Sequence, residues 1–198
     1  MGNYHILDSQ ATDITAQDNW YVIDTKSLPE NLAIKNIHLS ELLHKKERLD
    51  VILPFTDVLN PQDLLAETLG LIHRRSSRIG LWANTDLSTE QIDTLLKSRS
   101  DDSLPLLQHL DLIILYQPSF ADGRSFSQAR HLRQQGYEGE IRIAGDFGVD
   151  QIAYLKRAGI DSFIITAEDL NDDVVNAFYA LPSSYDGSVA NQLPMFRT

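Results

Sequence analysis

The sequence predicts an α/β fold with a mostly parallel sheet of about five strands flanked by helices, in an open, doubly wound arrangement. From residue 50 onward, short apolar strands alternate with amphipathic stretches of helical length. Strands such as 112–115 (LIIL) are apolar on both faces, as expected for parallel strands that helices cover on both sides. Because five units are too few for a complete eightfold barrel, the alternative is a partial or distorted TIM-like barrel.

Five strand–helix units follow one another in the chain. The predicted strands span residues 50–55, 78–84, 110–118, 140–145 and 161–166, and the predicted helices span 61–75, 88–99, 125–136, 149–159 and 171–181. Pro61 suits a first helical turn, and Ser88 or Thr89 can cap the second helix. Gly136 and Gly159 each stand at a helix end, where a left-handed conformation is common.

The two ends of the chain are less regular. Residues 4–8 (YHILD) and 20–24 (WYVID) are expected to form a β-hairpin or edge strands, and residues 39–48 a short helix. The tail, 182–198, lacks a helical period and is expected to lie extended over the body or over a neighbouring subunit. We expect the 198 residues to form a single α/β domain, with residues 1–49 as its less regular part.

The composition excludes several classes of function. The chain has no cysteine, which rules out disulfides, thiolate metal sites and a cysteine nucleophile. Its six histidines stand singly, so no preformed metal site is expected. A net charge of −11 disfavours sequence-independent binding to nucleic acid or to anionic lipid. Without a secretory signal or a long apolar run, the chain is expected to be cytoplasmic.

Two strand-to-helix loops contain most of the special residues. The loop PSFADGRS (118–125) follows the third predicted strand, and GDFGVD (145–150) ends the fourth. Ligands of parallel α/β sheets bind at the carboxyl ends of the strands, so Asp122, Arg124, Asp146 and Asp150 are expected around one crevice. Arg124 can clamp an oxyanion or a partner carboxylate, and Asp146 can act as a general base if burial raises its pKa.

Structural roles for the same residues stay open. Asp122 and Arg124 can simply fix the turn, Asp150 can cap the following helix, and Arg133 can lie on a solvated helix face. Neither loop matches the GxGxxG, P-loop or GxSxG motifs.

The two loops resemble the bacterial family catalogued as domain of unknown function 934, whose members are often labelled oxidoreductases probably involved in sulfite reduction. The resemblance therefore implies a link to assimilatory sulfite reduction. Ala158 stands where members often carry cysteine. The matching residues include Pro118, Phe120, Asp122, Gly123, Arg124, Phe126, Ser127, Ala129, Leu132, Arg133, Gly136, Tyr137, Gly139, Glu140, Arg142, Gly145, Asp146, Asp150, Gln151, Gly159, Asp161 and Phe163.

We therefore expect an accessory protein of sulfite reduction that binds a small anion or sulfite reductase itself. One alternative is an independent enzyme for a phosphorylated or sulfur-containing metabolite, with Asp146 as general base; another is that the loops only form a homodimer interface. No cofactor is assigned, and without cysteine the chain cannot hold an iron–sulfur cluster in the ordinary way. The predicted binding residues are Phe120, Asp122, Arg124, Ser127, Arg133, Arg142, Asp150 and Gln151.

Overall fold

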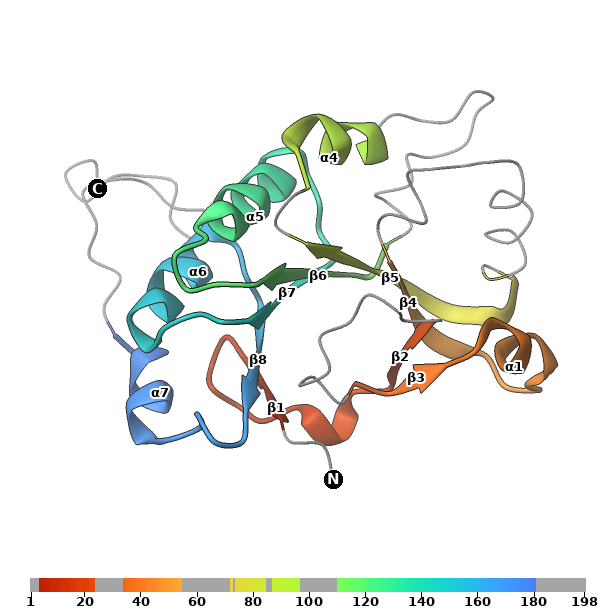
Figure 1. The fold of residues 1–198 in the computed structure, drawn as a ribbon, viewed down its shortest axis with the longest axis horizontal. Helices are drawn as coiled ribbons and strands as arrows, with labels where there is room; N and C mark the ends of the chain where they lie inside the picture. The colour runs from red at the N-terminus through yellow and green to blue at the C-terminus, as the bar shows by residue number, and fades with distance from the viewer. Residues whose placement is uncertain are drawn as a thin grey trace.

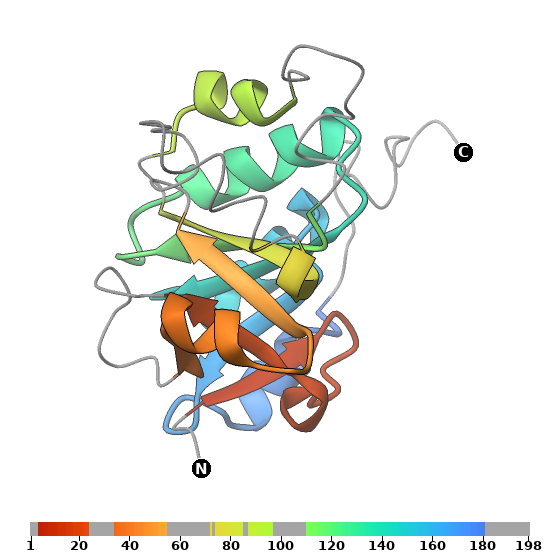
Figure 2. The same cartoon turned by 90° about the vertical axis from the view of Figure 1, so that its right-hand side faces the viewer.

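The computed structural model describes residues 4–23, 34–54, 72, 74–84, 87–96 and 110–180. Its centre is one eight-stranded sheet with the order β1-β8-β7-β6-β5-β4-β2-β3. Strand β1 runs antiparallel to β8, whereas the other pairs are parallel. The sheet curls into a half-barrel (Figures 1 and 2). The strands are β1 (Tyr4–Asp8), β2 (Trp20–Ile23), β3 (Asn36–Ile37), β4 (Leu49–Pro54), β5 (Ser76–Asn84), β6 (Leu112–Gln117), β7 (Glu140–Gly145) and β8 (Ser162–Thr166).

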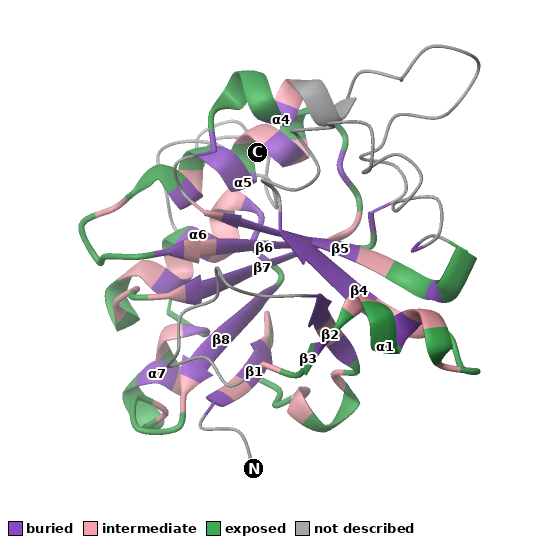
Figure 3. Ribbon diagram, turned by 45° about the vertical axis from the view of Figure 1, so that its right-hand side comes forward, coloured by how far each residue is buried: buried purple, intermediate pink, exposed green. Residues whose placement is uncertain are grey.

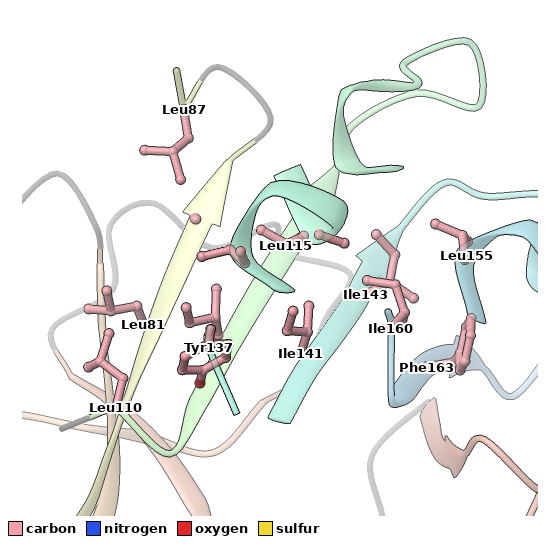
Figure 4. Close-up of a cluster of buried hydrophobic side chains, with 14 of the residues drawn as sticks. Leu81, Leu87, Leu110, Leu115, Tyr137, Ile141, Ile143, Leu155, Ile160 and Phe163 are labelled. Atoms are coloured by element: carbon pink, nitrogen blue, oxygen red, sulfur yellow. The ribbon is translucent and has the colours of Figure 1, made fainter. Parts of the chain in front are cut away.

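The helices lie on the outer face of the curled sheet (Figure 1). In the described part of the chain they are α1 (Leu39–His44), α4 (Thr89–Leu96), α5 (Arg124–Gln134), α6 (Ile152–Ala158) and α7 (Asp172–Ala177), with 3-10 turns η1 (Thr15–Gln17) and η3 (Val149–Gln151). Buried helix residues such as Leu132 and Leu155 share one core cluster with outward-facing strand residues such as Ile141 and Phe163. Figure 4 shows part of this outer core beneath α5.

A second core fills the inner face of the half-barrel. Its buried members all come from strands, and two of them, Trp20 and Trp82, are tryptophans. The Trp82 ring stacks on Tyr116 with 5.6 Å between ring centroids. The central strands are consequently buried on both faces, as Figure 3 shows for β6 and β7.

The predicted open, doubly wound sheet of about five mostly parallel strands is wrong, although the α/β class is right. Eight strands form a mixed, curled sheet, and the described helices pack on one face instead of two. The error has a physical cause: a strand such as Leu112–Leu115 is apolar on both faces whether its second face meets helices or the filled interior of a barrel. The partial-barrel alternative is nearer to the observed sheet.

Most individual elements lie where the sequence places them. The five predicted strands are β4 to β8, and Gly159 ends α6 in the left-handed region at φ 108°. The predicted segments 4–8 and 20–24 form edge-proximal strands but no hairpin, because β1 pairs with β8 whereas β2 pairs with β3 and β4. Nearly all of the helix predicted at 61–75, and all of the tail 182–198, fall outside the described residues.

Candidate functional site

Two loops meet at the carboxyl edge of β6 and β7. Residues 118–123 connect β6 to α5, and residues 146–148 connect β7 to η3 and α6. Gln117 lies opposite Gly145 in the parallel register, so both loops leave the sheet at the same level. We call residues 118–123 and 146–151 the edge loops. The sequence correctly places them side by side.

Gln117, the last residue of β6, connects the two edge loops through its side chain. Its side chain is fully buried, and its Nε2 donates to the backbone oxygen of Asp146 at 2.9 Å and to Oε1 of Gln151 at 3.2 Å. Its Oε1 accepts from the hydroxyl of Ser125 at 2.5 Å, which ties the start of α5 to the same point. Sequence reasoning missed Gln117, although a polar residue at the end of an otherwise apolar strand was a usable signal.

Asp146 and Gln151 hold the backbone of Phe120. The Phe120 N–H donates to Oδ2 of Asp146 at 3.0 Å, and Nε2 of Gln151 donates to the Phe120 oxygen at 3.1 Å. A Cβ at Gly148 would meet the Phe120 ring at 2.5 Å, so the ring needs glycine beneath it. Phe120 remains 48% exposed despite these contacts. The edge loops therefore fix the backbone of a residue whose aromatic side chain is exposed.

Asp122 and Arg124 form a two-point ion pair at the start of α5. Arg124 Nε donates to Asp122 Oδ1 at 2.9 Å, and Arg124 Nη2 donates to Oδ2 at 2.7 Å. The Arg124 side chain is 60% exposed, whereas that of Asp122 is 12% exposed. The pair thus sets the direction of an exposed guanidinium. Ser127 and Asp150 are exposed on α5 and η3, next to the same loops.

Arg133 lies at the other end of α5, away from the edge loops. Its guanidinium donates to the backbone oxygens of Gly159, Tyr137 and Gly139 at 3.1, 2.7 and 2.8 Å, and it also pairs with Asp161. These contacts join the end of α5 to the segments that precede β7 and β8. In this arrangement Arg133 connects elements of the scaffold.

Arg142 lies inside the half-barrel and is 3% exposed. Its Nη1 donates to Oδ1 of Asp18 at 2.8 Å, its Nη2 to Oε1 of Glu140 at 2.9 Å, and its Nε to the hydroxyl of Ser162 at 3.0 Å. Asp18 precedes β2, so this network links the N-terminal part of the chain to β7 and β8. Burial, together with the nearby negative charge of Asp18, also raises the pKa of the Tyr4 phenol.

The predicted site residues therefore form two groups. Phe120, Asp122, Arg124, Ser127, Asp146, Asp150 and Gln151 gather at the edge loops, whereas Arg133 and Arg142 lie elsewhere. Among the described residues, no group of three or more His, Cys, Asp or Glu could hold a metal ion. Within the same part of the chain, no helix is both long and apolar enough to cross a membrane.

The comparisons with known proteins identify a family but no activity. The family model described as "Bacterial protein of unknown function (DUF934)" matches residues 94–196, a range that includes β6 to β8 and both edge loops. A search of curated proteins found no match to the chain.

Proposed function

Because the chain belongs to the DUF934 family, whose description assigns no function, we propose from the geometry that it is an accessory protein rather than an independent enzyme. In this proposal the edge loops bind sulfite reductase. The observation that carries the binding role is that the loops satisfy their inner polar groups with one another while they present fixed, exposed side chains.

The exposed residues have the character of a protein interface. Phe120 and Val149 are 48% and 40% exposed, and Arg124 is held in one direction by Asp122. Aromatic residues and arginine are the types most enriched among residues that dominate binding energy. Because their backbone is already fixed, little ordering entropy would be lost on binding. These features support docking of a partner protein.

The choice of sulfite reductase rests on the label, probable involvement in sulfite reduction, that members of the resembled family often carry. The chain has no cysteine, so the partner would have to hold any iron–sulfur cluster. This favours an accessory role for the chain.

The enzyme alternative has less support. Asp146 is exposed, and its Oδ2 already accepts the N–H of Phe120. A general base is normally tuned by burial or by charged neighbours. Here the carboxylate instead holds a loop in place, which fits a binding surface better than a catalytic centre.

The test is calorimetric titration of the purified protein with purified sulfite reductase from the same organism. Phe120→Ala and Arg124→Ala should each weaken binding by about tenfold or more, as expected for central interface residues. Both residues are exposed, so each variant should melt within about 4 °C of wild type. Tyr154→Ala is the matched control, since Tyr154 is a 62% exposed aromatic residue on α6.

Three outcomes would contradict the proposal. Undiminished binding by both variants would remove the edge loops as the docking surface. No heat of binding with wild type would remove sulfite reductase as the partner. Light scattering that shows a dimer, converted to monomer by Phe120→Ala, would favour the homodimer interface instead.

A further inference from the structure

A pocket of about 410 Å³ is lined by α6 residues from its first turn to its last and by the residues that follow the helix, and no edge-loop residue lines it. It is formed where the end of α6 and the residues after α7 approach the turn that follows β1. Its lining includes Gln10, Lys156, Arg157, Ile160, Phe178 and Tyr179. The volume lies within the range of about 300–1,000 Å³ that is typical of sites for small organic ligands.

Hydrogen bonds between distant segments hold the pocket open. The Tyr179 hydroxyl donates to the backbone oxygen of Gln10 at 2.9 Å, and Lys156 Nζ donates to the backbone oxygen of Phe178 at 2.6 Å. The Phe178 ring packs edge-on against Phe163, with 4.9 Å between ring centroids. The walls therefore come from three parts of the chain that are fixed to one another, as in a preformed site.

The lining is positively charged in an otherwise acidic protein. It contains three basic residues, Arg133, Lys156 and Arg157, against one acidic residue, Asp161, which gives 3 − 1 = +2. Arg133 and Asp161 pair with each other, and Lys156 and Arg157 are the other basic residues of the lining. Asp8 is close enough to Lys156 to affect its pKa, and including Asp8 reduces the excess to +1.

Lys156 is the group best suited to receive an anion. Burial lowers the pKa of its ammonium group and the charge of Asp8 only partly opposes this effect, so a bound anion would favour the charged form of Lys156. A basic residue in the last turn of a helix often interacts only with the negative end of the dipole of that helix. Lys156 instead donates to Phe178, beyond α7, and an ammonium group has two further donors.

We propose that this pocket binds a small organic anion with one carboxylate and a compact apolar or aromatic body. Lys156 receives the carboxylate, while Ala153 and the exposed Tyr179 contact the apolar body; Ile160 and Phe178 also line the pocket but are only 2% and 3% exposed. An excess of one or two positive charges matches a monoanion better than a polyphosphate. The proposal concerns a different region from the edge loops and does not depend on what they bind.

Benzoate is the probe, titrated into the purified 198-residue protein and followed by two-dimensional amide NMR. We expect saturable shifts at the amides of Ala153, Ile160 and Tyr179. Benzyl alcohol, which lacks the charge, and sulfate, which lacks the apolar body, should each bind more weakly than benzoate. Lys156→Met should weaken benzoate binding about tenfold, the loss expected for one charge-assisted hydrogen bond.

Three further variants sharpen the test. Lys46→Met removes an exposed lysine beyond α1, outside the pocket, and should bind benzoate like wild type. Ala153→Leu adds bulk from an α6 position that lines the pocket without changing its charge, and it should also weaken binding. Phe120→Ala should leave benzoate binding unchanged, which separates this site from the edge loops.

The proposal is overturned by any of three results. Wild type could show no saturable shift, the shifts could lie outside the pocket, or Lys156→Met could bind benzoate as well as Lys46→Met does.

Discussion

Replacing Arg142 with methionine should destabilise the half-barrel strongly. Methionine keeps much of the side-chain length but removes the hydrogen bonds that the guanidinium donates to Asp18, Glu140 and Ser162. The Asp18 and Glu140 side chains are only 8% and 28% exposed, so water cannot fully replace the guanidinium. The partly buried carboxylates of Asp18 and Glu140 would then repel each other without the Arg142 cation between them.

The magnitude follows from the cost of an uncompensated buried charge. Removing one partner of a buried ion pair costs about 3–5 kcal/mol, a large share of the roughly 5–15 kcal/mol that stabilises an ordinary domain. For a chain of this size, each kcal/mol lowers the melting temperature by about 2–4 °C, so we expect a fall of about 6–20 °C. The same loss should appear in the midpoint of urea unfolding.

The assay needs two matched variants. Arg130→Met removes an exposed arginine from α5 and should change the stability by no more than about 0.5 kcal/mol. Asp18→Asn, combined with Arg142→Met, should recover part of the loss because one uncompensated charge is removed. The reasoning is refuted if Arg142→Met melts within about 2 °C of wild type, or if the double variant is as unstable as both single losses added together.

Two other changes test the backbone and the pH dependence. Gly145→Ala should lower the free energy of unfolding by at least about 2 kcal/mol, because φ is 106° and a Cβ there would clash with the Gln117 backbone oxygen. Gly123→Ala is the control: it has open space around it, and its free energy of unfolding should change by no more than about 1 kcal/mol. Equal urea midpoints for the two variants would disprove the difference. Partial burial pushes the pKa of Asp13 upward, but hydrogen bonds from the Thr15 side chain and backbone lower it below its ordinary 3.8. This carboxylate therefore stabilises the fold above about pH 4, and its contribution is lost as the pH falls through the lowered pKa. Asp13→Asn should be less stable than wild type near neutral pH and equal to it in acid, and a gap independent of pH would contradict this assignment.

Local patterns revealed the elements from β4 to β8 but not how the strands at either end of the sheet pair or how the sheet curls. Apolar runs and helix-ending glycines are local signals, and Gly159 adopts the left-handed conformation that its position predicts. The pairing of β1 with β8 joins residues 4–8 to residues 162–166, and neither segment contains a signal that names its partner. An apolar second face of a strand also looks the same in the sequence whether helices cover that face or it lines the filled interior of a half-barrel.

The candidate site was predictable in part for the same reason. Consecutive parallel strands place their following loops side by side, so the meeting of the two edge loops followed from the strand order. Arg142 alternates with Ile141 and Ile143 along β7, and alternation alone suggests that it faces solvent. Its inner face is closed by the segment around Asp18, which is 124 residues away in sequence. Only the curl of the sheet, which brings Asp18 to this face, reveals that the arginine is buried.

The pairing of β1 with β8 also determines the order of events during synthesis. Strand β1 pairs with β8, for example Tyr4 with Thr166, so β1 cannot join the sheet until β8 has left the ribosome. At about 5–20 residues per second, the first strand waits roughly 10–30 s for its partner. During that interval Ile6 and Leu7, which are 1% and 2% exposed in the finished fold, have no β8 to cover them. Strand β1 therefore stays open to pairing with other chains until β8 is available to pair with it.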